Sequence, residues 1–190
     1  MFFFKKKKKV GIEIDTKMLQ PGDCVLISGE HFISRGIKWF TNSKYNHVAL
    51  YVGGGEGYVI EATEAGVEKN KLSKLLQSAS GVCIRRVPNL TVFQAELIKN
   101  KAYQLLYQNY DFLQFISMIP YFLFRKIGFN FPFLLLNSRN RMICSELYAV
   151  CLYAAGIKLK SSIKKFKSIT PEDLYRSDLL VTVYEKVNEK

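Results

Sequence analysis

Cys144 is the residue of this 190-residue chain whose position is best suited to chemistry. It opens the run CSELYAVCLYAAG (144–156), whose apolar residues recur at helical spacing and which ends at a glycine. A sulfur atom at the start of a helix faces unbonded backbone N–H groups and the positive end of the helix dipole, and both stabilise a thiolate. The same N–H groups can bind the oxyanion that forms when a carbonyl is attacked. Taken alone, however, a free cysteine more often simply packs in a core.

The chain has two histidines, His31 and His47, so there are few choices for a general base. Histidine suits that role because its pKa of about 6.5 lets it accept and return a proton near neutral pH. His47 opens the run HVALYV, where period-two alternation places it with Ala49 and Tyr51 on one face of a predicted strand. We expect His31 in a solvated loop. Without Cys144 and Glu61, an ordinary, satisfied histidine at a strand edge would be the default interpretation of His47.

Glu61 interrupts the apolar run YVIEA in a second predicted strand, where a carboxylate is unfavourable unless it is paired. If strands 47–52 and 58–62 are antiparallel neighbours, this carboxylate approaches the His47 ring and can orient it. An outward-facing glutamate at a sheet edge is the alternative interpretation.

The segments around these residues predict a mixture of strands and helices. Apolar runs rich in β-forming residues, with turn signals between them, predict strands at residues 19–27, twice within 46–67, and at 81–87. Apolar positions at helical spacing or capping residues predict helices at 32–40, 91–107, 144–156 and 169–177. Length and hydrophobic content predict one globular domain, residues 19–190, after a basic tail of residues 1–18.

The composition limits the partners and the cellular setting. The formal charge of +12 favours phosphates, anionic membranes or acidic substrates without choosing among them. The four cysteines form no Cys-x-x-Cys pair and the N-terminus lacks the apolar stretch of a secretory signal, so we expect reduced thiols and a cytosolic location. With only two histidines we expect neither a structural zinc site nor another metal. The glycine-rich turn lacks the pattern of a phosphate-binding loop, and no cofactor is expected.

The segment FLQFISMIPYFLFRKIGFNFPFLLL (112–136) is strongly apolar. Prolines and the Arg125–Lys126 pair interrupt it before any span reaches about 18 residues, so we do not expect it to cross a bilayer. It could pack as two short core helices, form a lid or an acyl-chain groove, or contact a membrane peripherally. For the lysine run 5–9 we expect a solvated tail, with membrane contact as the alternative.

Six motifs make the sequence resemble the permuted branch of the NlpC-type papain-like superfamily, which includes YiiX-type and poxvirus-type proteins. They cover most of residues 19–180, in the order QPGDCVLI, ISRGIKWFTNSKYNHVALYVG, YVIEATEAGV, NYDFLQF, MICSELYAVCLYAAGI and ITPEDLYRS. In ordinary papain-like enzymes the cysteine precedes the histidine, whereas here His47 comes first, as a circular permutation of the same site requires.

The resemblance implies an α+β fold of circularly permuted papain-like type, with an antiparallel sheet or small barrel packed against the helix that starts at Cys144. It also implies a cysteine hydrolase in which Cys144 is the nucleophile, His47 is the base and Glu61 orients the base. The substrate would be an amide in a peptide or a lipid, and water would complete the cycle.

Three more residues are expected beside this site, as substrate-binding or supporting groups. Tyr110 and Asp111 match a Tyr-Asp pair that the family carries before its cysteine, although a helix-end aromatic residue and a cap would explain them nearly as well. Ser145 lies in the first turn of the helix that Cys144 begins.

Two other functions stay open at this point. One is a lipid-directed thioesterase or acyltransferase in which residues 112–136 receive an acyl chain. The other is a non-catalytic module of the same fold that binds membranes through its basic surface. Beyond net charge there is no nucleic-acid recognition motif, so no specific nucleic-acid partner is expected. The sequence does not indicate an oligomeric state.

Overall fold

A computed structural model describes most of the chain. The described residues are 12–29, 44–63, 65–107, 109–110, 141–142, 144–159 and 169–187. Several predictions made from the sequence lie outside these residues, namely those on residues 1–11, His31, the helix at 32–40, Asp111 and the segment 112–136.

The centre of the fold is a six-stranded sheet with the strand order β4-β3-β2-β1-β5-β8, and all its neighbours are antiparallel. Its strands are β1 (Cys24–Gly29), β2 (His47–Gly53), β3 (Tyr58–Thr63), β4 (Gly66–Lys71), β5 (Ala79–Arg86) and β8 (Val181–Val187). The edge strands β4 and β8 do not pair with each other in the described chain, so the sheet is open. Of the two expected architectures, the structure has the antiparallel sheet and not the closed barrel.

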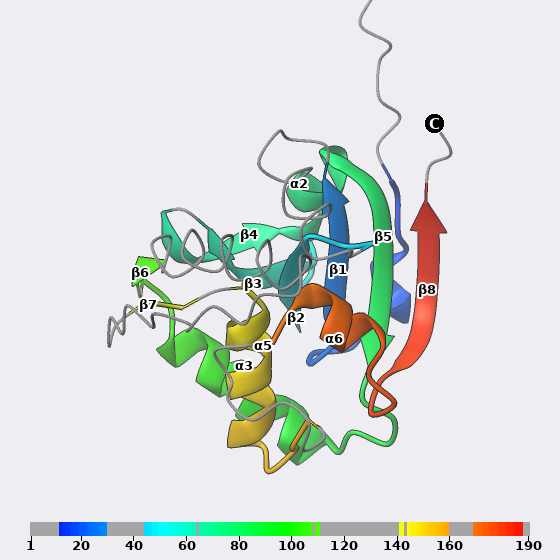
Figure 1. Ribbon diagram of the computed structural model, residues 1–190. Helices are drawn as coiled ribbons and strands as arrows, with labels where there is room; N and C mark the ends of the chain where they lie inside the picture. The colour runs from blue at the N-terminus through cyan, green and yellow to red at the C-terminus, as the bar shows by residue number, and fades with distance from the viewer. Residues whose placement is uncertain are drawn as a thin grey trace, which may run out of the picture.

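Helices and short elements complete the fold (Figure 1). They are the 3-10 helix η1 (Thr16–Met18), the α-helices α2 (Leu72–Gln77), α3 (Val92–Gln104), α5 (Cys144–Ala154) and α6 (Pro171–Tyr175), and the parallel pair β6 (Asn109–Tyr110) and β7 (Arg141–Met142). The predicted strands at 19–27 and 81–87 and the helices at 91–107, 144–156 and 169–177 are confirmed, with shifted ends. Six described elements were not predicted, namely η1, β4, α2, β6, β7 and β8.

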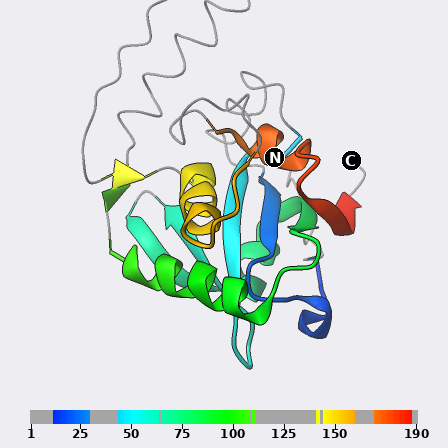
Figure 2. The same ribbon diagram turned by 90° about the horizontal axis from the view of Figure 1, so that it is seen from below.

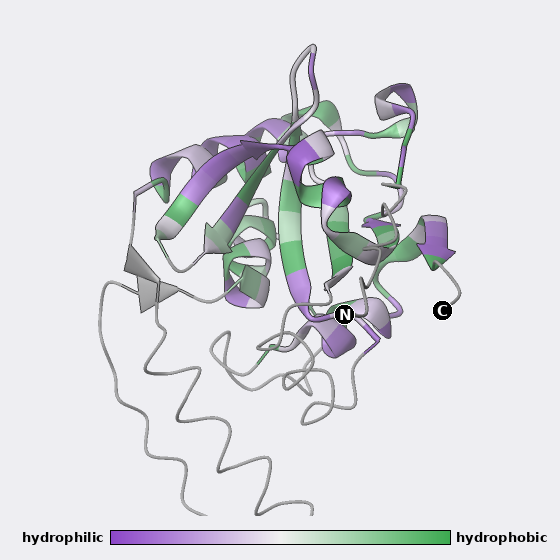
Figure 3. Ribbon diagram, turned by 90° about the horizontal axis from the view of Figure 1, so that it is seen from above, coloured by the Kyte–Doolittle hydropathy of each residue, from purple (hydrophilic) through white to green (hydrophobic). Residues whose placement is uncertain are grey.

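Both faces of the sheet are buried. One face packs against α3, α5 and α6, and alternate residues of the central strands, such as Val48 and Leu50, lie in this core. The other face, with Ala49 and Tyr51, packs against α2 and the segment that precedes β1. The predicted alternation along β2 is therefore confirmed. Figure 2 shows α3 and α5 together on one side of the sheet, and in Figure 3 the hydrophobic colour follows the central strands.

Local sequence signals explain where the helices begin and end. Thr91 and Thr170 cap α3 and α6, each in a reciprocal capping box with the residue three positions later. Gly156, with φ of 76°, follows the end of α5 in the left-handed conformation that glycine adopts without strain.

A buried ion pair fixes the turn before β1. Asp23 is 1% exposed, and its two carboxylate oxygens accept hydrogen bonds from Nε and Nη2 of Arg86 at 2.6 and 2.7 Å. Arg86 also donates to the carbonyl of Met18, which ties β5 to the segment before β1.

Within the described ranges, no helix has both the length and the apolar character needed to span a membrane.

Candidate active site

The pairing of β2 with β3 brings His47 and Glu61 together. Ala49 lies directly opposite Glu61, so Glu61 shares a face with His47, two residues before Ala49. The two side chains meet with 2.5 Å between His47 Nε2 and Glu61 Oε2. Because an ionised carboxylate only accepts hydrogen bonds, Nε2 carries the proton and donates it. The remaining ring nitrogen, Nδ1, is then the one free to face a nucleophile.

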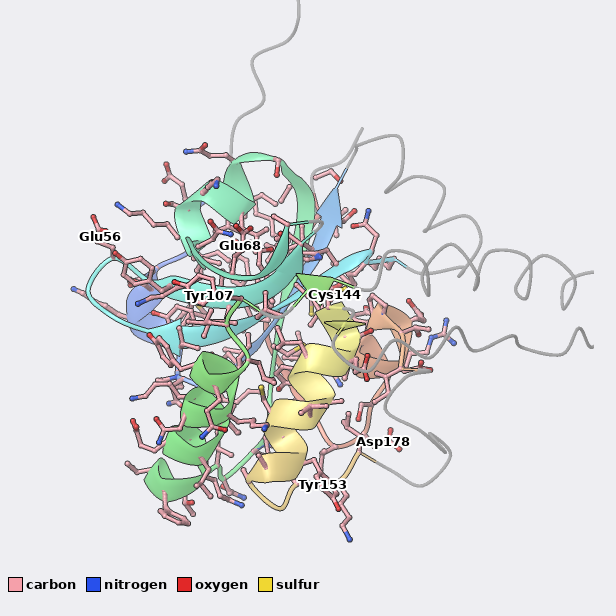
Figure 4. The ribbon with its side chains drawn as sticks, turned by 90° about the vertical axis from the view of Figure 1, so that its left-hand side faces the viewer. Glu56, Glu68, Tyr107, Cys144, Tyr153 and Asp178 are labelled. Carbon is pink, nitrogen blue, oxygen red and sulfur yellow. The ribbon has the colours of Figure 1, made fainter. Side chains whose placement is uncertain are left out.

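Cys144 begins α5, at the end of the helix that meets the sheet, whereas Tyr153 lies at the far end (Figure 4). Its side chain is partly buried against the core under α5. Two hydrogen bonds fix this helix. The hydroxyl of Ser145, which is 1% exposed, donates to the carbonyl of Ile169, and the Tyr148 hydroxyl donates to the carbonyl of Gly22 at 3.1 Å.

The charges at the site favour a thiolate beside an imidazolium. Burial lowers the pKa of His47, but the hydrogen bonds and charges of Cys144 and Glu61 together outweigh burial and raise the pKa above its ordinary value. Burial raises the pKa of the Cys144 thiol, and the hydrogen bond and charge of His47 lower it, together with two backbone N–H groups. The net effect is a lowered thiol pKa. Each group thus stabilises the charged form of the other.

Backbone N–H groups add to this effect on the sulfur. Hydrogen bonds from the N–H groups of Val48 and Ser145 lower the pKa of Cys144 further. The Ser145 N–H belongs to the first turn of α5, where backbone donors have no partner within the helix. This is the thiolate-stabilising helix start expected from the sequence.

The other three cysteines differ sharply from Cys144. All four thiols are free, but Cys24, Cys83 and Cys151 are fully buried in the core. Burial raises the pKa of Cys24, raises that of Cys83 to about 11 and raises that of Cys151 to about 12. Their positions are those of cysteines that only pack in the core.

The start of β2, which carries the histidine, is anchored on both sides. The buried Tyr45 donates its hydroxyl to Glu185 of β8 at 2.6 Å. Asn46 accepts the backbone N–H of Gly29 at 2.9 Å, which joins the start of β2 to the end of β1. The backbone that presents His47 is therefore fixed by contacts outside the site.

The structure places the remaining expected site residues as follows. Ser145 follows Cys144, and its hydroxyl is engaged with the carbonyl of Ile169, so its backbone N–H is the part that reaches the sulfur. The backbone of Tyr110 belongs to β6, which pairs with β7. Asp111 lies outside the described residues.

One residue that the sequence did not single out also contacts the site. Asn70 of β4 donates from Nδ2 to Oε1 of Glu61 at 3.0 Å. The strand pairing explains this contact: β3 and β4 are joined by the short connection at 64–65, and Asn70 lies two positions after Glu68, the partner of Glu61, and so on the same face of the sheet.

Comparisons with known proteins agree with this picture. A family model described as permuted papain-like amidase enzyme, YaeF/YiiX, C92 family, matches residues 18–184. The probable lipoprotein peptidase YaeF of Escherichia coli is 33% identical over 121 residues, which are 64% of this chain and 43% of that protein. This match therefore spans less than half the length of the relative.

The crystal structure of the metalloprotein YiiX from Escherichia coli O157:H7 has the same fold. It matches with a TM-score of 0.67 at 20% identity, over 88% of this chain and 98% of that one. In the described part of this chain, no three side chains of the metal-binding types His, Cys, Asp or Glu are grouped so that they could hold a metal ion. The described residues thus do not match a metal site.

Proposed function

Because the chain belongs to the family of permuted papain-like amidases, we propose that it is a cysteine hydrolase that cleaves an amide bond. In this proposal Cys144 is the nucleophile, His47 the base, and Glu61 the group that orients the base. The observation that supports it most directly is the 2.5 Å bond between His47 and Glu61, beside a thiol whose pKa is lowered. The family match to 18–184 supports treating residues 19–190 as one hydrolase domain.

The first half of the reaction forms an acyl-enzyme. The thiolate of Cys144 attacks the carbonyl carbon of the substrate and a C–S bond forms. The carbonyl oxygen becomes an oxyanion, and backbone N–H groups in the first turn of α5 are the donors best placed to stabilise it. The C–N bond then breaks as the imidazolium of His47 protonates the leaving nitrogen. The products of this half are a free amine and a thioester on Cys144.

The second half hydrolyses the thioester. His47, now neutral, takes a proton from a water molecule, whose oxygen attacks the thioester carbon. The C–S bond breaks, the acid leaves, and the thiolate forms again beside the reprotonated imidazole. Throughout the cycle Glu61 accepts the Nε2–H bond, so the ring keeps one orientation and Nδ1 does the proton transfer.

For the substrate we propose a peptide amide, and the name of one relative extends this to peptides that carry a lipid. YaeF is named a probable lipoprotein peptidase, which supports testing acylated peptides beside plain ones. The lipid-directed alternatives, a thioesterase or an acyltransferase, depend on residues 112–136, which lie outside the described residues.

The test is turnover of a set of amide substrates, with and without an acyl chain, by the wild type and by Cys144→Ala and His47→Ala. We expect the wild type to release free amine and Cys144→Ala to release none. In the wild type a covalent adduct on Cys144 should appear at early times, seen as added mass in the intact protein. His47→Ala should lower the rate by about 100-fold or more, as expected for loss of general acid–base catalysis. Turnover that persists in Cys144→Ala would refute the proposal.

Acceptor choice separates hydrolysis from acyl transfer. If the adduct is released to water at the same rate with and without added amines or alcohols, the enzyme is a hydrolase. If release requires such an acceptor, the protein is an acyltransferase and the hydrolase proposal is wrong. A matched thioester substrate distinguishes a thioesterase, because only the thioester would then be turned over.

A further inference from the structure

Both oxygens of the Glu61 carboxylate are hydrogen-bonded within the protein. Oε2 accepts from His47 Nε2 at 2.5 Å, and Oε1 accepts from Asn70 Nδ2 at 3.0 Å. The Glu61 side chain is only 7% exposed, so the protein and not water supplies these donors. Two fixed donors define the rotation of the carboxylate about its last torsion, which is otherwise soft.

The amide of Asn70 is itself fixed from its other side. Its Oδ1 accepts a hydrogen bond from Nζ of Lys74 at 3.3 Å. Asn70 lies near the end of β4 and Lys74 in α2, which begins at Leu72 directly after the strand. If the amide were turned over, its oxygen would face the carboxylate and its NH₂ group would face the ammonium, so chemistry allows a single orientation.

The charges that face Glu61 come from three elements. Burial raises the pKa of its carboxyl. The hydrogen bond and charge of His47, followed by the hydrogen bond from Asn70 and the charge of Lys74, outweigh burial and leave the pKa lowered. Glu68 lies directly opposite Glu61 on β4, but its carboxylate accepts the hydroxyl of Thr63 at 2.8 Å.

We infer that Asn70 and Lys74 form an outer positioning pair, which keeps Glu61 ionised and directed at the ring of the base. This inference rests on the proposed function, because it extends the same site outward. Asn70 contacts Glu61 directly and Lys74 contacts Asn70, so both act on the base through Glu61. The groups form one chain: thiolate, imidazolium, carboxylate, amide and ammonium.

The pair can be tested by the pH profile of Cys144 alkylation with iodoacetamide, read by mass spectrometry of the Cys144 peptide. Asn70→Asp keeps the size of the side chain, removes the donor and places a second carboxylate beside Glu61. The acid limb of the profile is the pH range over which the alkylation rate rises as the thiol loses its proton. We expect this limb to move up by about one pH unit or more in Asn70→Asp. Asn70→Ala removes the donor without adding charge and should move the limb in the same direction by a smaller amount.

Substitutions of Lys74 test the last group of this hydrogen-bonded chain. These variants should fold, because Lys74 is exposed. Lys74→Met should move the limb up by about half a pH unit, since an exposed charge is partly screened, and Lys74→Arg should restore the wild-type profile. Lys71→Met is the matched control. Lys71 is also exposed and pairs instead with Glu56 at 2.7 Å, so its loss should leave the profile unchanged.

The outcomes separate this inference from the proposed function. Should the wild-type thiol react no more readily at low pH than an ordinary cysteine, both the proposed function and the positioning pair are wrong. If His47→Ala abolishes the enhanced reactivity but Asn70→Asp and Lys74→Met leave the profile in place, only the positioning pair is wrong. Equal shifts in Lys74→Met and Lys71→Met would also overturn it, because the effect would then be general surface charge.

Discussion

Replacing Glu61 with glutamine removes one negative charge from beside His47 and keeps the shape of the side chain. The Glu61 side chain is 7% exposed, so its bond to His47 is shielded from water. Hydrogen bonds to charged groups contribute about 1.5–3 kcal/mol. Since one pKa unit corresponds to about 1.4 kcal/mol, the pKa of His47 should fall by about one to two units. The ion pair between the Cys144 thiolate and this imidazolium is weakened by the same free energy.

The assay is the rate of Cys144 alkylation from about pH 4 to about pH 9, a range that spans the pKa values of activated thiols and needs no substrate. In Glu61→Gln the acid limb should move up by about one to two pH units, so that at a fixed pH on that limb the rate falls about 10- to 100-fold. Glu68→Gln is the control, because Glu68 is bonded to Thr63. A profile for Glu61→Gln that overlays the wild type would show that Glu61 does not support the ion pair.

The same charges connect the stability of the protein to pH. The lowered pKa of Glu61 stabilises the fold above its unfolded pKa of about 4.3, and this contribution is lost as pH falls through the folded value. The raised pKa of His47 stabilises the fold below its unfolded pKa of about 6.5, and this is lost as pH rises through the folded value. The melting temperatures of wild type and Glu61→Gln should therefore differ most between about pH 4.3 and pH 6.5. An equal difference at every pH would contradict this linkage.

Two predictions concern the scaffold. Arg86→Met leaves the buried Asp23 without its partner and should lower the free energy of unfolding in urea by about 3–5 kcal/mol, whereas loss of the 72% exposed Arg176 should cost less than about 1 kcal/mol. Similar values for the two variants would refute the role of burial. Gly57 has φ of 71° and an added Cβ would lie 2.9 Å from Thr16, so Gly57→Ala should destabilise by about 1–3 kcal/mol. Gly55→Ala meets no atom within 4 Å and should be close to neutral, and a stable Gly57→Ala would contradict the strain.

The inner part of the site could be predicted from the sequence because it depends on one hairpin and one helix start. An apolar run that begins with His47 and a second run interrupted by Glu61 predict paired strands, and pairing alone brings the two side chains to one face. The start of a helix at Cys144 follows from the spacing of the apolar residues after it. The convergence of the helix with the hairpin was an inference from family resemblance, because the spacing contains nothing about how distant elements pack.

The outer part could not be predicted because its elements carry weak local signals. From Glu68 to Lys71 the strand β4 is a run of polar residues without alternation, which is what a half-exposed edge strand tolerates. The helix α2 has six residues and begins without a side-chain cap. Asn70 lies where these two elements join, and its contact with Glu61 depends on the register of β3 with β4, which no single residue specifies.

The edge strand β8 could not be predicted from the sequence for a different reason. Its residues Val181–Val187 are rich in β-forming types, but all of them are exposed or half-buried, so hydrophobic alternation does not mark the strand. Its place beside β5, far earlier in the chain, is a long-range pairing. The anchor that Glu185 gives to Tyr45 follows from that pairing and was equally inaccessible to sequence reasoning.

The order of the reactive groups along the chain has a consequence for the nascent protein. His47 and Glu61 are 14 positions apart and meet inside one hairpin, a unit that closes within microseconds once its strands exist. The sulfur comes from a helix that starts 83 positions after Glu61, and the last strand of the sheet, β8, follows that helix in the chain. Until α5 packs against the hairpin, the sulfur of Cys144 lacks the hydrogen bond and the charge of His47 that lower its pKa. Full activation of the thiol is therefore a property of the assembled fold, and neither the hairpin nor the helix provides it alone.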